Sequence, residues 1–203
     1  MKILHPQEKI LEEYNYNGLK VELAFWSGAT FCGKLVFAGN LTDEPNVDQA
    51  LSGFFALDHA GIRRCENDWD VCLSIDYLSA ERPNGVMFGY LVNEGNIPKE
   101  FDIFKIPAAF FLRILINEET AACLKRKPWK GGIPPYEWIG EQIAPALGFQ
   151  YGKDTLPIIE YYGSISRKFK SIGFAIYMCR YKKSKLCDPM KNGAAIMAAP
   201  LKS

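Results

Sequence analysis

Apolar residues in this chain occur mostly in short runs of strand length, separated by polar residues, glycine and proline. Such runs predict β-strands, because β-branched and aromatic side chains fit a pleated, half-buried surface. In chain order, the expected strands are residues 19–26, 30–39, 70–78, 85–92, 101–106, 108–116, 156–162 and 172–181. The third and fourth of these are expected to pair as a hairpin, and so are the last two.

Two segments, residues 43–61 and 134–149, change to helical spacing. Asp43 and Asn46 are candidate N-caps of the first helix, and Pro145 requires a kink or an early end in the second. The expected apolar face of the first helix consists of Val47, Leu51, Phe54 and Phe55, and Gly61 is its expected stop. The first 18 residues, rich in Glu, Lys and Asn, are predicted to form a short helical or irregular extension.

The order strand, helix, strand, strand occurs twice, which indicates an internal repeat. Similar segments lie 79 to 87 residues apart, as when "IDY" from Ile75 is matched with "IEY" from Ile159. We therefore predict an α+β fold built from a duplicated βαββ unit, with antiparallel sheets, pseudo-twofold symmetry and a central ligand cleft. In this alignment Asp76 and Glu160 occupy equivalent positions. The expected divisions are an extension at 1–18, a binding domain at 19–181 with halves at about 19–95 and 101–181, and a tail at 182–203.

Glu160 stands in the middle of the strand-like run "LPIIEYYGS". An ionised carboxylate is a poor strand former and is costly to bury without a partner. Two interpretations stay open: Glu160 faces water on a half-exposed strand, or it lies in a pocket that takes a positive charge. Because side chains alternate along a strand, Ile158, Glu160 and Tyr162 share one face. A carboxylate beside aromatic rings suits an organic cation.

Several short motifs in the second half resemble the GyrI-like small-molecule-binding domain, which is also the effector-binding domain of AraC- and MerR-type multidrug regulators. The motifs are the strand Ile106-Pro107-Ala108, Trp138 within a helix, Glu160 followed by Tyr162, and Ile176-Tyr177 in the last strand. Their order and spacing resemble the family over about residues 68–181. One departure is Cys179, which stands where the family's last strand usually has proline.

The resemblance implies a protein that holds a lipophilic or cationic molecule in an aromatic cleft with an acidic floor. Because 18 leading residues are too few for a helix-turn-helix pair with its core, we expect the stand-alone form of the binding domain. Its candidate ligand-binding residues are Glu160, Tyr162, Trp138, Tyr77, Tyr90, Tyr177 and Phe110. An alternative is a hydrolase of an electrophilic small molecule, in which Glu160 activates water as a general base. A third hypothesis, a protein-interaction module such as a gyrase inhibitor, follows from the family name alone.

Composition and charge narrow the function classes. The 203 residues carry a formal net charge of +1, whereas proteins that bind nucleic acid are usually strongly basic. The N-terminus lacks the apolar core of a signal peptide, and no run reaches the roughly 18 apolar residues of a membrane span. We therefore expect a cytoplasmic protein without a membrane partner. With two histidines and six cysteines in no CxxC spacing, neither a metal nor another cofactor is expected.

Overall fold

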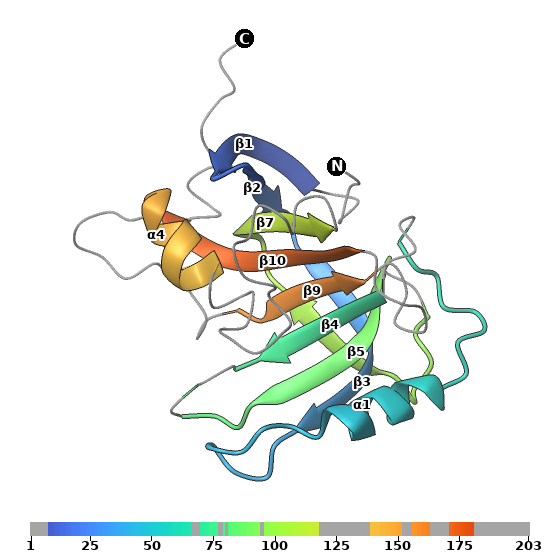
Figure 1. Ribbon diagram of the computed structural model, residues 1–203. Helices are drawn as coiled ribbons and strands as arrows, with labels where there is room; N and C mark the ends of the chain where they lie inside the picture. Colours follow the sequence, from blue (N-terminus) through green and yellow to red (C-terminus); the bar gives the residue numbers. More distant parts are fainter. Residues whose placement is uncertain are drawn as a thin grey trace.

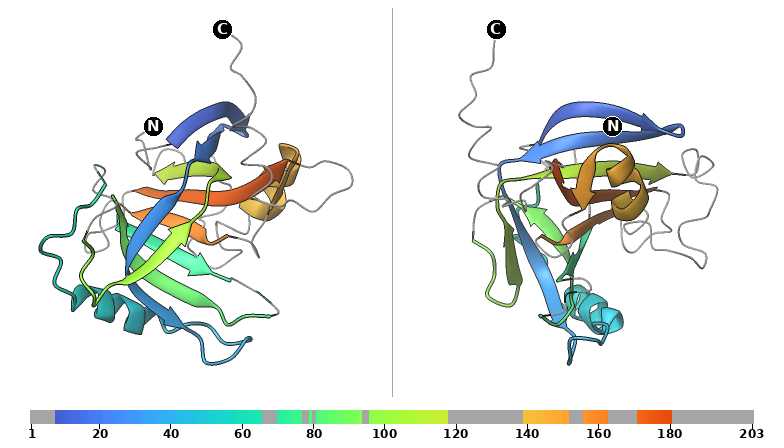
Figure 2. Two further views of the ribbon diagram at one scale, coloured as in Figure 1. Left: turned by 180° about the vertical axis from the view of Figure 1, so that it is seen from behind. Right: turned by 90° about the vertical axis from the view of Figure 1, so that its left-hand side faces the viewer.

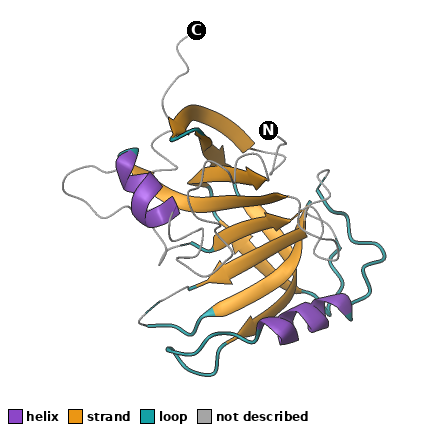
Figure 3. Ribbon diagram, in the orientation of Figure 1, coloured by secondary structure: helices purple, strands orange, loops and turns teal. Residues whose placement is uncertain are grey.

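A computed structural model shows how these segments are arranged. It describes residues 8–65, 70–76, 79, 81–93, 96–117, 139–151, 156–162 and 171–180, of which residues 115–117, 151, 161, 162 and 171–180 are described by their backbone alone. The described chain is mostly antiparallel sheet with few helices, as expected of the α+β class (Figures 1 and 3). No helix in this part of the chain is long and apolar enough to cross a membrane.

The strands described belong to one sheet whose order is β1-β2-β7-β10-β9-β4-β5-β3-β6, with β8 paired to β10. Their bounds are Glu8–Tyr16 (β1), Leu19–Trp26 (β2), Ala29–Phe37 (β3), Asp70–Ile75 (β4), Gly85–Val92 (β5), Asp102–Ile106 (β6), Ala109–Asn117 (β7), Phe149–Tyr151 (β8), Ile158–Tyr162 (β9) and Ser171–Arg180 (β10). Both expected hairpins are confirmed, because β4 pairs with β5 and β9 pairs with β10. The short strand β8 was not expected.

The first helix, α1, spans Val47–Phe55 and is capped by Asn46, whose side-chain oxygen accepts a hydrogen bond from the backbone N–H of Gln49. The helix ends before the expected stop at Gly61. The expected apolar face is wrong in part, because Ala50 and Phe54 are the buried residues and Val47 and Phe55 are about half exposed. The positions of Val47, Leu51 and Phe55 and those of Ala50 and Phe54 both have the spacing of one side of a helix. Of these two sets, only Ala50 and Phe54 are buried against the sheet.

The second helical segment consists of a π-helical turn, η1 (Ile139–Ile143), and a short α-helix, α4 (Ala144–Ala146). Pro145 stands at the start of α4, where its missing N–H is tolerated, and the helix ends at the next residue. The early end expected from this proline is therefore confirmed. The predicted first part of this helix, residues 134–138, lies outside the described residues.

The N-terminal segment is a strand, and the predicted helical or irregular extension is wrong. β1 pairs with β2 across Asn17 and Gly18, which both adopt positive φ angles of 51° and 85°. Two such residues in succession form the tight hairpin turn that Asn-Gly favours. The dipeptide was therefore the signal for this strand, and the glutamates of β1 lie largely along a half-exposed edge.

The sheet curls back on itself through one bent two-stranded ribbon. Only Ser27 and Gly28 separate β2 from β3, and only two residues separate β6 from β7. β2 pairs with β7 up to Trp26 opposite Ala109, and β3 pairs with β6 from Ala29 opposite Ile106, so a single register runs through the bend. Gly28 has φ 136°, a conformation that side chains rarely adopt. The β2–β7 pair near one end of the sheet and the β3–β6 pair at the other end are therefore parts of one continuous ribbon (Figure 2).

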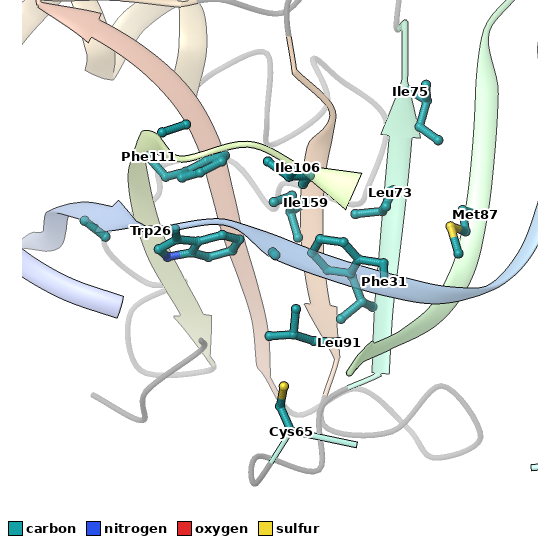
Figure 4. Close-up of a cluster of buried hydrophobic side chains, with 14 residues drawn as sticks. Trp26, Phe31, Cys65, Leu73, Ile75, Met87, Leu91, Ile106, Phe111 and Ile159 are labelled. Carbon is teal, nitrogen blue, oxygen red and sulfur yellow. The ribbon is translucent and has the colours of Figure 1, made fainter. Parts of the chain in front are cut away.

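The curled sheet has an inner face filled with apolar side chains and an outer face that carries the helices. Figure 4 shows the inner cluster, which includes Trp26, Phe31, Leu73, Met87, Leu91, Phe111 and Ile159. On the outer face, one cluster packs under η1 and α4 and another packs under α1. Where the backbones of β3 and β5 approach closely, Gly33 lies opposite Gly89.

A buried ion network ties β1 to the inner face. Arg113 of β7 donates hydrogen bonds to Glu22 of β2, at 2.6 Å, and to Glu8 of β1. The indole N–H of Trp26 also donates to Glu8, at 3.2 Å. Burial alone would raise the pKa of Glu22, but hydrogen bonds from Lys20 and Arg113 lower that pKa below its ordinary value. The network therefore keeps the Glu22 carboxylate ionised inside the fold.

We expect Gly89→Ala to lower the free energy of unfolding by about 2–3 kcal/mol, the upper part of the range for overpacked sites. A Cβ atom at Gly89 would lie 2.2 Å from the carbonyl oxygen of Cys32, so the backbones must separate. Gly39→Ala is the matched control, because its Cβ would lie no closer than 3.8 Å to another group, and it should change stability by less than about 0.5 kcal/mol. Urea unfolding of both variants measures this. Equal effects would contradict the close approach.

Glu22→Gln should destabilise the fold by about 3 kcal/mol at neutral pH, because it removes one partner of a buried ion pair. The folded-state pKa of Glu22 lies below its ordinary value of 4.5, so the stability from its ionised form is present above that pH. As the pH falls through the lowered pKa, this stability is lost. The difference between the wild type and Glu22→Gln should therefore shrink below about pH 4.5. A difference independent of pH from 3 to about 7 would argue against an ionised Glu22.

Candidate functional site

Strand pairing places Glu160 on the outer face of the sheet. Glu160 lies directly opposite Cys72 of β4 and Phe174 of β10. Directly opposed residues of antiparallel strands share a face, and Cys72 belongs to the cluster packed under α1. Ile158, two residues before Glu160, packs under η1 and α4. Glu160 therefore stands between the two areas that the helices cover, and its side chain is partly exposed.

The row of the sheet that contains Glu160 has apolar side chains next to the carboxylate and a cation at its far end. From Lys34 of β3, which is ion-paired with Asp102, it runs through Phe88 of β5 and Cys72 of β4 to Glu160, and Phe88 and Cys72 are buried. Burial raises the pKa of the Cys72 thiol well above its ordinary value, and the nearby Glu160 carboxylate raises it further. A negative charge at Glu160 thus affects the pKa of a thiol on the neighbouring strand, β4.

One side of α1 adds exposed apolar surface beside this row. A Cβ atom at Gly53 would lie 2.8 Å from Cγ of Lys34, so the Gly53 side of the helix faces β3. The sheet order β4-β5-β3 then directs the opposite side of α1, with Val47, Leu51 and Phe55, towards β4. Val47 is 48% exposed and Phe55 is 52% exposed. Figure 1 shows α1 along β3 and β5, with β4 and β9 next to them.

The next row of the sheet, which contains Asp70 and Tyr90, is already in contact with a cation, the side chain of Arg64. Asp70 lies opposite Tyr90 of β5 and forms an ion pair with Arg64. The guanidinium carbon of Arg64 lies 3.5 Å from the centre of the Tyr90 ring. Burial raises the pKa of Tyr90, and the charge of Arg64 partly offsets this rise. This row therefore combines a carboxylate, an aromatic face and an organic cation within the chain itself.

The structure brings only some of the candidate residues together. Tyr90 lies one row from Glu160 on the outer face, whereas Phe110 packs against Phe25 at 5.1 Å, near the η1 and α4 cluster. The Glu160 row crosses β7 at Ile114, four residues from Phe110. Only backbone positions are described for Tyr162, which is opposite Asp70, and for Tyr177, which is opposite Phe111. Tyr77 and Trp138 lie outside the described residues.

The expectation that Asp76 and Glu160 occupy equivalent positions is wrong. Glu160 lies within β9, whereas Asp76 lies beyond the end of β4 with φ 51°. Asp76 also forms an ion pair with Arg82 at 2.6 Å. The similarity of "IDY" and "IEY" therefore does not place the two carboxylates at the same point of their strands.

Arg64, Asp70 and Cys72 were not among the candidate residues. A register for the first hairpin would have placed Asp70 and Cys72 on the face of Glu160, but the loop that carries Arg64 has no comparable signal.

A separate hollow of about 460 Å³ lies past the Tyr90 end of β5 and is lined by Gly61, Ile62, Arg63, Val92, Asn93, Asn96 and Ile97. Glu160 does not line it. Within the described residues, no three His, Cys, Asp or Glu side chains form a group that could hold a metal ion.

Glu160→Gln should speed alkylation of Cys72 by iodoacetamide at about pH 8.5 by roughly two- to ten-fold. Removing the nearby negative charge favours the thiolate, which is the reactive form. Cys65 is the internal control, because burial is the cause of its raised pKa and its rate should stay constant. Peptide mapping by mass spectrometry separates the two sites. An unchanged Cys72 rate would mean that Glu160 is uncharged or faces elsewhere.

Comparisons with known proteins find similarity in structure alone. No protein-family model matches the chain, and no curated protein matches its sequence. The integron cassette protein VCH_CASS2 from the mobile metagenome of Vibrio cholerae is 12% identical, with a TM-score of 0.49 over 78% of this chain and 95% of that chain. SAV2435 bound to tetraphenylphosphonium is 11% identical, with a TM-score of 0.48 over 83% and 94%. The C-terminal domain of EcmrR is 10% identical, with a TM-score of 0.47 over 80% and 99%.

Proposed function

We propose that the chain binds a lipophilic organic cation on the outer face between α1 and the η1–α4 segment, with Glu160 as the negative charge of the site. The observation that carries this proposal is the position of Glu160. It is a partly exposed carboxylate in a row with buried Phe88 and Cys72, beside the exposed apolar side of α1. The proposed site accordingly offers charge and apolar surface together.

The chemistry of such a surface favours one class of ligand. A carboxylate flanked by apolar groups is poorly solvated, so a cation that approaches it gains attraction in a medium of lower dielectric than water. A strongly hydrated ion must give up its own water to bind there. A cation whose charge is spread over rings or alkyl groups loses less hydration and also covers apolar surface such as Val47 and Phe55.

The strand order supports the further proposal that the two halves are copies of one unit, and that the site lies where they meet. In the first half the neighbours are β3, β5 and β4, and in the second half they are β7, β10 and β9. These sets meet at the β4–β9 pair. The strand before each set crosses to the other half, because β2 pairs with β7 and β6 pairs with β3.

The remaining candidate residues enter the proposal by their resemblance to the GyrI-like family. Tyr162 shares the strand face of Glu160 by alternation along β9, and Trp138 precedes η1. Tyr77 is retained on the same ground, whereas Tyr177 is left out of the proposed site because it lies opposite Phe111 of the inner face. The proposed unit spans residues 19–181, and β1 adds to its edge by pairing with β2.

The test uses a matched pair of ligands, tetraphenylphosphonium as a permanent cation and triphenylphosphine oxide as a neutral compound. Glu160→Gln should weaken binding of the cation by about 1–3 kcal/mol, the range for a charge-assisted contact, because shape is kept and charge is lost. The neutral compound should be little affected. Isothermal titration calorimetry measures both affinities.

Asp76→Asn is the control, since Asp76 lies at the end of β4 and pairs with Arg82. It should leave both affinities within about two-fold, less than 0.5 kcal/mol. Equal losses for the two ligands in Glu160→Gln, or none for either, would refute the role of Glu160. An absence of cation binding by the wild type would refute the proposed function as a whole.

A further inference from the structure

We propose that Tyr90 and Asp70 form a second organic-cation site, and that the side chain of Arg64 occupies it. This site is independent of the proposed role of Glu160, although it lies on the next row of the same face. Its ligand class is a planar guanidinium or a small alkylammonium ion. In the folded chain, Arg64 provides that ligand from within.

The two walls of the site come from neighbouring strands in register. Asp70 begins β4 and lies directly opposite Tyr90 of β5. Arg64 meets both, because its Nη2 contacts Oδ1 of Asp70 and its guanidinium carbon lies 3.5 Å from the centre of the Tyr90 ring. A planar cation held edge-on by a carboxylate and face-on by a ring is the arrangement that guanidinium ligands prefer.

The Tyr90 ring is held in place by other aromatic groups. Phe54 of α1 packs against it at 5.1 Å, and His59 packs against it at 5.5 Å, both edge to face. His59 also packs against Phe101 at 5.7 Å. Because these contacts do not involve Arg64, the ring should keep its orientation when the Arg64 side chain is removed.

The backbone that carries Arg64 is also anchored separately from its side chain. Arg64 forms an isolated β-bridge with Val92, and the N–H of Cys65 donates to the carbonyl of Leu91 at 2.9 Å. Truncation of the Arg64 side chain should therefore vacate the space over Tyr90 without releasing the loop. The ring and the carboxylate would remain as a preformed site.

The guanidinium itself is incompletely bonded. The buried Nε of Arg64 has no hydrogen-bond partner within the described part of the chain. The side chain is 31% exposed, and that of Asp70 is 15% exposed. An arginine whose only role is in a buried hydrogen-bond network normally has the N–H donors of its guanidinium paired with acceptors. Among the described residues, Arg64 is held by its contact with the Tyr90 ring and by its ion pair with Asp70, and a free cation can supply both of these interactions.

The experiment is chemical rescue of Arg64→Ala, followed by thermal unfolding. At a concentration about ten times its Kd, n-propylguanidinium should raise the melting temperature of Arg64→Ala by roughly 3 °C or more relative to its effect on the wild type. The wild-type measurement corrects for general denaturation by guanidinium. The neutral isostere n-propylurea should give no such difference.

Two further variants separate this site from a general effect of lost charge. Arg82→Ala removes the arginine of the ion pair at the other end of β4, where Arg82 is 58% exposed, and should not be rescued. Arg64→Ala combined with Asp70→Asn should lose the rescue.

Arg64→Gln gives a second test if the alanine variant fails to fold, and should also bind n-propylguanidinium more tightly than the wild type does. Equal responses of wild type and Arg64 variants, or equal rescue of Arg82→Ala, would overturn the proposal. Because Glu160 takes no part in this measurement, its outcome is separate from that of the proposed function.

Discussion

The single register of the bent ribbon is the constraint on which the rest of the structure depends. Residues before and after Gly28 pair without a shift with residues after and before Pro107, although the pairing passes from one end of the sheet to the other. A slip of one residue would turn every side chain of the ribbon to the opposite face. Trp26 and Phe111 would then leave the inner core, and Glu22 and Arg113 would move to the outer face. Apolar and ionic side chains thus specify the same register.

The curvature that this ribbon imposes explains why helices and charged candidates occupy the outer face. The inner face is filled by large apolar side chains such as Phe31 and Met87, so it leaves little room for a ligand. The outer face is covered by two short helical segments over different parts of the sheet. The central strands β4 and β9 lie between these parts, and Glu160 is on β9. The location of Glu160 therefore depends on the curling of the sheet as well as on the local sequence of β9.

Much of the fold could be predicted from hydrophobic pattern, because both hairpins and the main strands have strong local signals. The first strand was missed because its glutamates conceal the alternation, and the Asn17-Gly18 turn was the better indicator. The site was harder to predict. Glu160 stood out as a charged residue in a strand, but its neighbours depend on register, which the similarity of "IDY" to "IEY" does not supply. Arg64 comes from a loop and had no signal of its own.

Under the proposed function, Arg64 and Glu160 together would let one small surface distinguish between cations. Arg64 covers the ring of Tyr90 and pairs with Asp70, so the positive charge of that row is supplied internally. Asp70 and Cys72 are two residues apart on β4, which sets the two rows about 7 Å apart. A bound cation beside Glu160 would thus lie near the charge of Arg64, partly screened by Asp70. A ligand with one dispersed charge meets this arrangement with less repulsion than a ligand with two concentrated charges. In the proposed site, the chain's own arginine would thereby favour diffuse monovalent cations, in agreement with the apolar surface that α1 contributes.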